Sequence, residues 1–293
     1  MTLEQLAIFI AVAEREHLTR AADAIHLTPS AVSAAIRNLE QRYGVELFHR
    51  VGRRIELTAA GRLFLVEAQA TVSRARGAEL ALSELGGLMR GTLSVHASQT
   101  IASYWLPPRL MEFRAAYPGI ALTLTLGNTR TVANAVVSGE ADLGFVEGEI
   151  DEPALAASAV DADELTVVVG PAHPWAGNMP PGPPAIADAD WIMREEGSGT
   201  RSVFEAALLR MGVAPEKLSV ALVLPSNEAI LSALGDGRCA AAISRLAARS
   251  HIDAGHLVAV DLPLGGRTFL SLHHKERHRS RAALELARLC GAR

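Results

Sequence analysis

Two stretches of the 293-residue sequence carry residue types that suit the binding of a small anion. Residues 195–201 are Glu-Glu-Gly-Ser-Gly-Thr-Arg, in which the glycines allow close backbone approach while the hydroxyls and the arginine supply donors and a fixed positive charge. Residues 98–100 are Ser-Gln-Thr, and both stretches lie between an expected strand and an expected helix, where free N–H groups attract anions. The predicted contacts are Ser98, Gln99, Thr100, Gly197, Ser198, Gly199, Thr200 and Arg201.

Two further residues belong to this candidate site, and one alternative stays open. Asn227 follows Leu-Pro-Ser at another expected helix start, so it is predicted at the rim. Glu147 follows an expected strand and is either an acceptor for an ammonium group or a surface carboxylate. A glycine-serine-threonine turn before a helix is also ordinary capping chemistry, so residues 197–201 have that second interpretation.

Strands that alternate with helices are expected to position these residues. Such an order predicts parallel sheets covered by helices, with ligands bound beyond the carboxyl ends of the strands. We expect two α/β lobes around a cleft, lobe one from about 91–162 and 268–293 and lobe two from about 163–267. The expected strands are 93–97, 120–126, 141–146, 165–169, 191–194, 220–224, 240–243, 257–260 and 268–274, and the expected helices are 103–116, 129–138, 201–211, 227–234 and 281–289.

A different chemistry is expected near the start of the chain, in residues 18–40. Thr19 is predicted to cap a first helix, 20–25, and Thr28 a second, with Pro29 at its first position. Apolar residues at three- and four-residue steps would then pack the second helix from behind, while Ser30, Ser33 and Arg37 face outward. This division suits a helix-turn-helix in a DNA major groove, although an αα-hairpin inside another helical domain has the same pattern.

The flanking segments favour the DNA-binding interpretation. Residues 3–13 form one apolar stripe, which predicts a third helix that completes a small core. Residues 49–58 indicate a short hairpin whose tip carries Arg50, Arg53 and Arg54, a basic wing for the phosphate backbone. Residues 28–54 contain five arginines against Glu40 and Glu46, so positive charge gathers locally although the whole chain has a net charge of −4.

Residues 1–65 therefore resemble the winged helix-turn-helix of LysR-type transcriptional regulators. The matched positions are Phe9, Ala21, Ala22, residues 30–33 (Ser-Ala-Val-Ser), Leu39, Glu40, Gly44, Val45, Leu47, Phe48, Arg50, Leu57, Thr58 and Gly61. The resemblance implies double-stranded DNA as partner, with Ser30, Ser33 and Arg37 near base edges and Thr28, Arg50, Arg53 and Arg54 near phosphates or a minor groove. Pro29 also belongs to the predicted DNA-binding surface. Many family members have long polar residues where this chain has Pro29, Ala34 and Ala35. We therefore expect sparse base contacts, with Arg37 the strongest candidate, and much of the site preference from DNA shape and wing contacts.

The resemblance extends over the whole chain. It implies an α+β multidomain protein with a winged helix-turn-helix, a long linker helix and a two-lobed α/β effector domain like a periplasmic binding protein. Residues 197–201, Gly-Ser-Gly-Thr-Arg, are similar to a stretch in a branch of the family that responds to sulfur, nitrogen or inorganic-carbon status. The expected function is a sequence-specific DNA-binding regulator whose cleft senses a small, anionic metabolite.

One long helix is expected over residues 59–88, because this stretch lacks proline and repeats apolar residues. Such a stripe needs a partner, and we predict a homodimer through residues 59–88, with pairing of dimers into a tetramer left open. A helix packed on its own domain is the alternative. The glycines at 86, 87 and 91 indicate a joint, so the expected domains are 1–58, 59–90 and 91–293.

Several function classes find no support in the sequence. The alternative function is an enzyme that acts on a small anionic substrate in the cleft. The sequence contains no catalytic or metal-binding motif with a recognisable spacing, so we expect no catalytic residue, metal or cofactor. Cys239 and Cys290 are too few for a disulfide framework and are interpreted as small buried residues, with redox sensing as the alternative. The sequence shows no apolar run of membrane-spanning length and no basic leader followed by an apolar segment. We therefore expect a cytoplasmic protein.

Overall fold

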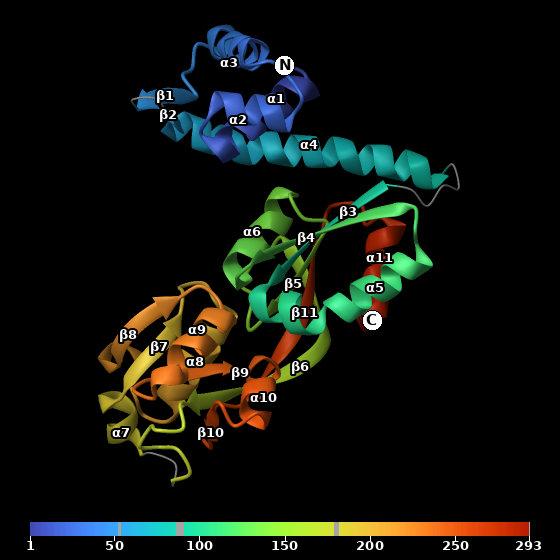
Figure 1. Cartoon of the computed structure of the whole chain (residues 1–293). Coiled ribbons are helices and arrows are strands. Elements are labelled where there is room, and N and C mark those ends of the chain that lie inside the picture. The colour runs from blue at the N-terminus through green and yellow to red at the C-terminus, as the bar shows by residue number, and fades with distance from the viewer. Residues whose placement is uncertain (52–53, 86–90, 179–181, 293) are drawn as a thin grey trace. The chain divides into compact units, whose positions relative to one another are not determined.

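The computed structural model describes residues 1–51, 54–85, 91–178 and 182–292 (Figure 1). The chain forms two compact units, the first of residues 1–88 and 138–140 and the second of residues 89–137 and 141–293. No helix in the described ranges is both long and apolar enough to cross a membrane.

The first unit is a small helical core with a two-stranded hairpin and one long helix. Its elements are α1 (Leu3–Arg15), α2 (Leu18–Ala24), α3 (Pro29–Tyr43), β1 (Phe48–Val51), β2 (Arg54–Leu57) and α4 (Ala59–Leu85). Phe9, Ala21, Ala22 and Val32 are fully buried in one cluster, and the two alanines let α2 approach its neighbours closely. The predicted winged helix-turn-helix is confirmed in this arrangement.

Local capping explains where the two helices of this motif begin and end. The Thr28 hydroxyl accepts from the Ala31 N–H at 3.2 Å, and α3 ends at Gly44 in the left-handed conformation (φ 66°). The prediction of Thr19 as the earlier cap was wrong. His17 holds that position, because its backbone is extended and its ring nitrogen Nδ1 accepts from the Arg20 N–H at 3.4 Å.

The wing is an antiparallel pair of β1 and β2 in which Arg50 lies opposite Ile55. Its entry is fixed by Glu40, whose Oε1 accepts from the N–H groups of Leu47 at 2.9 Å and Phe48 at 3.2 Å. Arg53, one of the predicted DNA contacts, lies outside the described residues.

Helix α4 begins after Thr58, whose hydroxyl accepts from the Gly61 N–H at 2.9 Å. Several of its large apolar side chains face solvent: Leu63 is 75%, Val66 53% and Leu82 71% exposed. The predicted glycine joint falls largely on residues 86–90, which lie outside the described residues.

The second unit is built on one mixed sheet with the strand order β4-β3-β5-β11-β6-β9-β7-β8, and β10 pairs with β6. The strands are β3 (Gly91–Ser98), β4 (Ile120–Gly127), β5 (Leu143–Glu147), β6 (Leu155–Val169), β7 (Asp190–Arg194), β8 (Ser219–Leu224), β9 (Ala240–Ser244), β10 (Val258–Val260) and β11 (Gly266–His274). The helices are α5 (Pro107–Ala116), α6 (Thr129–Ser138), α7 (Pro183–Asp188), α8 (Gly199–Arg210), α9 (Asn227–Ala233), α10 (Arg245–Asp253) and α11 (Arg281–Leu289).

Two strands join the lobes. The long strands β6 and β11 run antiparallel beside each other, and β11 also pairs with β5, so the end of the chain returns to complete the first sheet as expected (Figure 1). Phe113, Phe145 and Phe269 lie in the core of lobe one, while Trp191 and Phe204 lie in that of lobe two. The predicted two-lobed α/β architecture is confirmed.

Three local features differ from the expected elements. Strand β6 begins at Leu155 rather than near residue 165, because its first half pairs with β11. The helix expected from residue 103 is a π-helical turn, Ile101–Trp105, followed by α5, since Pro107 and Pro108 lack the N–H that a continuous helix needs. The short helices α7 and α10 were not predicted.

Candidate functional site

The outer face of α3 carries the predicted DNA contacts. Thr28, Pro29, Ser30 and Arg37 are exposed, and Ser33 is half-buried. Arg37 Nη1 donates to Ser33 Oγ at 2.7 Å, so the guanidinium is held one helical turn from the serine. Val32, Ile36 and Leu39 are buried on the opposite face, which leaves the polar face for a groove.

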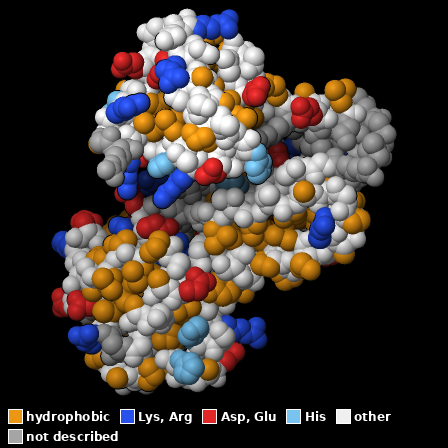
Figure 2. All heavy atoms as spheres, turned by 45° about the horizontal axis from the view of Figure 1, so that its top comes forward, with side chains coloured by type: hydrophobic (Ala, Val, Ile, Leu, Met, Phe, Trp, Pro, Cys, Tyr) orange, Lys and Arg blue, Asp and Glu red, His pale blue; other side chains and the backbone are white. Residues whose placement is uncertain are grey.

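The wing carries two of the predicted DNA contacts among the described residues. Arg50 and Arg54 are exposed on neighbouring strands of the wing, where Arg54 lies opposite Val51. On the face of the molecule drawn in Figure 2, Lys and Arg side chains stand at several separate places among hydrophobic and acidic ones. Arg50 and Arg54 are therefore accessible for contacts with DNA phosphates.

In the second unit, the centre of the contact between the lobes is a buried arginine that sequence reasoning missed. Arg267 on β11 has a side chain 0% exposed, and its guanidinium donates to Asp163 Oδ2 from Nη2 at 2.8 Å and from Nε at 3.0 Å. Nη1 also donates to Glu147 Oε1 at 3.3 Å and to Thr200 Oγ1 at 2.8 Å, and Nη2 donates to Thr100 Oγ1 at 3.4 Å. One guanidinium therefore binds a hydroxyl from each lobe.

Glu147 belongs to the same network. It is 2% exposed, which rules out the surface-carboxylate interpretation, and Oε2 accepts from Ser98 Oγ while Oε1 accepts from Arg267. Its backbone carbonyl accepts from Thr129 Oγ1 at 2.9 Å. An added Cβ on Gly199 would collide with that carbonyl oxygen, so only glycine lets the start of α8 lie against this strand end.

Gln99 and Asn227 make a second contact between the lobes. The Asn227 N–H donates to Gln99 Oε1 at 3.1 Å, and Asn227 Nδ2 donates to Thr100 Oγ1 at 3.0 Å. Glu228 accepts from Gln99 Nε2 at 2.5 Å and from the Tyr104 hydroxyl at 2.8 Å. Burial and this carboxylate both raise the pKa of Tyr104, so the phenol remains a donor.

The predicted stretch 195–201 divides between this buried contact and an open pocket. Thr200 is committed to Arg267, whereas Arg201 bonds Glu205 Oε1 at 2.7 Å and the Arg194 carbonyl at 3.3 Å. Ser198 precedes α8 as its N-cap residue, yet its hydroxyl makes no capping bond. Ser198 Oγ is buried and has no hydrogen-bond partner among the described residues, so the simple capping interpretation does not account for it.

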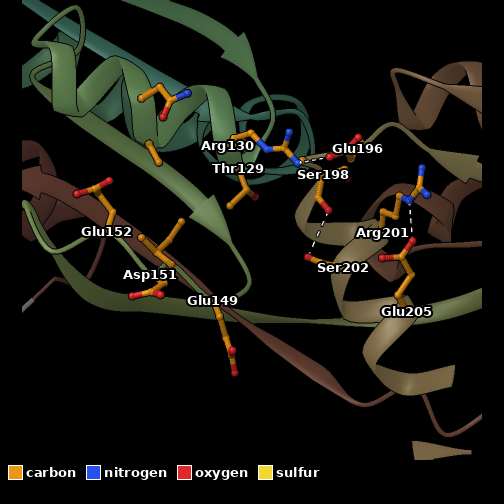
Figure 3. A pocket seen from close by; sticks show the side chains of 14 residues that line it. Thr129, Arg130, Glu149, Asp151, Glu152, Glu196, Ser198, Arg201, Ser202 and Glu205 are labelled. Carbon is orange, nitrogen blue, oxygen red and sulfur yellow. Dashed lines mark hydrogen bonds and ion pairs between the residues drawn. The ribbon is translucent and has the colours of Figure 1, made fainter. Parts of the chain in front are cut away.

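A pocket of about 490 Å³ opens beside Ser198 (Figure 3). Its walls come from the start of α6, the segment after β5 and the start of α8, and they include Thr129, Arg130, Glu149, Asp151, Glu152, Glu196, Gly197, Ser198, Arg201 and Glu205. Of the ten predicted contacts, Gly197, Ser198 and Arg201 line this pocket. The other seven, Ser98, Gln99, Thr100, Glu147, Gly199, Thr200 and Asn227, lie in the buried contact between the lobes.

An ion pair and several hydrogen bonds cross the rim of the pocket. Arg130 of lobe one pairs with Glu196 of lobe two at 2.9 Å, and this hydrogen bond lowers the pKa of the Glu196 carboxyl. The Arg130 N–H also donates to the Gly197 carbonyl at 3.2 Å. Asn128 Nδ2 donates to Glu195 Oε1 at 3.2 Å, so α6 and the 195–197 turn are joined by several polar contacts.

Other titratable side chains are structural in this geometry. His173 packs edge-on against Trp175, and burial lowers its pKa. Burial raises the pKa of Cys290 to about 12, which keeps it a thiol, and Cys239 is half-buried. Within the described ranges, no group of three or more His, Cys, Asp or Glu residues could hold a metal ion.

Comparisons with known proteins match both units. Residues 3–62 match the family described as "Bacterial regulatory helix-turn-helix protein, lysR family", and residues 86–293 match the "LysR substrate binding domain". The "Uncharacterized HTH-type transcriptional regulator YeiE" of Escherichia coli K12 is 35% identical over 292 residues, which cover 99% of this chain and 97% of that protein.

Solved structures share the fold. Full-length CbnR complexed with its target DNA has a TM-score of 0.67 at 20% identity, over 99% of this chain and 100% of that one. The regulatory domain of CcmR from Synechocystis PCC6803, in complex with 2-PG, has a TM-score of 0.62 at 28% identity, over 69% of this chain and 96% of that one.

Proposed function

Because the chain belongs to the LysR family of bacterial helix-turn-helix transcriptional regulators, we propose that the cleft of its second unit senses a small metabolite with an anionic group. The chain is a DNA-binding regulator with an effector-binding domain, and the family contains regulators rather than enzymes, so the alternative of an enzyme is dropped. Action on chromosomal DNA would take place in the cytoplasm.

The first unit is proposed to bind two half-sites as part of a homodimer. Exposed Leu63, Val66 and Leu82 on α4 support pairing of this helix with a second copy, since an unpaired apolar stripe is costly in water. Under this proposal the domains are 1–58, 59–90 and 91–293. Sedimentation of the full chain is expected to show a dimer or a dimer of dimers. The double variant Leu63→Glu/Val66→Glu should shift the protein toward monomer. Arg20→Glu, at an exposed position on α2, is the control and should not change the oligomeric state.

The orphaned hydroxyl of Ser198 is the observation that carries the effector proposal. It is 3% exposed, lacks a partner among the described residues and lies at the start of the twelve-residue helix α8, beside the pocket. Backbone N–H groups of a first helical turn have no intrahelical partners and attract negative charge. An anionic group that accepts from Ser198 Oγ and from these N–H groups would satisfy all of them, with Arg201 near by.

The carboxylates and hydroxyls of the buried contact have another role in this proposal. Ser98, Thr100, Glu147 and Thr200 already satisfy one another or Arg267. We therefore assign the anion to Ser198 and the start of α8, and the buried contact to holding the lobes together. The regulatory domain of CcmR with 2-PG supports a small-molecule effector for this kind of domain.

Thermal melting of the full chain against sulfate, sulfite, thiosulfate, phosphate, nitrate and small carboxylates tests the proposal. A ligand at 100 times its Kd adds about 2.7 kcal/mol, which corresponds to a rise of about 5 °C or more in Tm. Ser198→Ala should abolish the rise. Ser244→Ala is the matched control, because Ser244 Oγ is also buried without a partner in the described part of the chain but lies outside the pocket. An equal rise in wild type and Ser198→Ala would contradict the proposal.

A further inference from the structure

The two faces of the pocket beside Ser198 carry opposite chemistry. On one side lies the start of α8 with Ser198 and Arg201 (Figure 3). On the other side lies the segment between β5 and β6, which presents Asp151 and Glu152, with Glu149 below them in the view of Figure 3. We call residues 149–152 the acidic wall. A ligand in this pocket therefore meets Ser198 and carboxylates already paired with arginine at one end, and the carboxylates of the acidic wall at the other.

The arginines of the pocket do not neutralise the acidic wall. Arg130 pairs with Glu196 at 2.9 Å and Arg201 pairs with Glu205 at 2.7 Å. The structure gives the three wall carboxylates no ion pair with any described residue. The Glu152 carboxylate accepts one hydrogen bond, from the Ala154 N–H at 3.1 Å. The lining thus carries five carboxylates against two guanidinium groups, a surplus that disfavours a ligand with only negative charge.

The buried Ser198 hydroxyl is independent of this acidic cluster and itself calls for a ligand atom. It is 3% exposed, has no partner in the described ranges and lines the same pocket. The pocket volume, about 490 Å³, lies within the range of about 300–1,000 Å³ that holds organic ligands. A small inorganic anion would fill only a fraction of it.

We propose that the effector is a zwitterion, whose anionic group binds at Ser198 and the start of α8 and whose ammonium or guanidinium group faces the acidic wall. This inference rests on the proposed effector site and specifies its ligand class. A ligand with both charges satisfies the orphaned donors and also offsets the surplus of carboxylates.

Matched probe pairs separate the two charges. Taurine and isethionate share a sulfonate, phosphoethanolamine and ethyl phosphate share a phosphate, and 4-aminobutyrate and butyrate share a carboxylate. In each pair only the first member carries an ammonium group. Titration calorimetry with the full chain is expected to show about tenfold tighter binding of the ammonium member in at least one pair.

Two double variants test the acidic wall. Glu149→Gln/Asp151→Asn is expected to remove the preference for the ammonium member. Glu216→Gln/Glu276→Gln is the control, because it neutralises two exposed carboxylates that do not line the pocket and should leave the preference intact.

The outcomes distinguish this inference from the proposed function. If the anion-only members bind at least as tightly as their partners and Ser198→Ala weakens them, the anion site stands and the zwitterion is wrong. If the ammonium preference survives in Glu149→Gln/Asp151→Asn, the acidic wall has no part in it and the inference is likewise overturned. If neither member of any pair binds the wild type, both proposals fall.

Discussion

Replacement of Arg267 by methionine is expected to destabilise the second unit strongly. The guanidinium is fully buried and donates to Asp163 at 2.8 Å and Glu147 at 3.3 Å, and each of these side chains is only 2% exposed. Methionine keeps an unbranched, flexible side chain but has no charge. The variant therefore leaves two carboxylates in the interior without the cation that compensates them.

The size of the effect follows from the burial of all three groups. Removal of one partner from a buried ion pair costs about 3–5 kcal/mol, whereas an exposed pair is worth about 0–1 kcal/mol. For a unit of this size, each kcal/mol lowers Tm by about 2–4 °C. The expected decrease is about 6–20 °C.

Tryptophan fluorescence is a suitable assay, because Trp105, Trp175 and Trp191 are the three tryptophans of the chain and all lie in the second unit. The exposed pair Arg245–Glu164, at 3.2 Å, supplies the control: Arg245→Met should change Tm by no more than about 4 °C. A decrease for Arg267→Met no larger than that of the control would refute the reasoning.

A charge-compensated variant separates loss of charge from loss of packing. Arg267→Met/Glu147→Gln/Asp163→Asn removes the carboxylate charges together with the guanidinium. Since replacement of a whole buried ionic group by neutral residues is often close to neutral, this triple variant should recover much of the lost stability. If it melts as low as the single variant, the destabilisation comes from packing instead.

Further changes have equally specific outcomes. Gly199→Ala should cost about 1–3 kcal/mol in chemical denaturation, because its Cβ would strike the Glu147 carbonyl oxygen, whereas Gly212→Ala, with open space around it, should show only the cost of its positive φ. Arg50→Ala should make the fall of log K with log salt for operator binding shallower by about 0.9, the value for one lost phosphate contact. Arg37→Ala should instead reduce the ratio of specific to non-specific affinity. The Cys239→Ser variant keeps Cys290 as its one thiol, and burial raises the pKa of Cys290 to about 12. A thiol reagent at pH 8 should therefore modify Cys290 only after unfolding, and fast reaction of the folded variant would contradict this.

The elements that could be predicted from sequence are those whose ends are set locally. Thr28, Pro29 and Gly44 fix both ends of α3 through capping and a left-handed residue. The last helix, α11, also spans residues 281–289 as expected, with the Ser280 hydroxyl accepting from the Ala283 N–H at 3.0 Å. Such signals act within four residues, so a single sequence contains them.

The first half of β6 could not be predicted, because its residues lack strand propensity. Residues 156–163 are alanines, serine, valine and aspartates, and the strand exists through its register with β11, more than a hundred residues further along. The same non-local cause hid Arg267 and Asp163 from the candidate site. The last strand was expected to begin at Thr268, one residue after Arg267, and nothing in the local sequence indicates that this arginine is buried in the folded chain.

The buried charges also bear on where we propose that the ligand anion binds. Two carboxylates already compensate the Arg267 guanidinium, so an anion added beside it would bring uncompensated negative charge into the interior, whereas the Ser198 hydroxyl has no acceptor within the described part of the chain. Thr200 and Ser198, two residues apart in one motif, should therefore respond differently. Thr200→Ala leaves a buried guanidinium N–H unpaired and should lower Tm by several degrees with or without ligand. Ser198→Ala should leave the ligand-free Tm nearly unchanged and remove only the ligand-induced rise, and the reverse pattern would show that the anion binds at the buried contact.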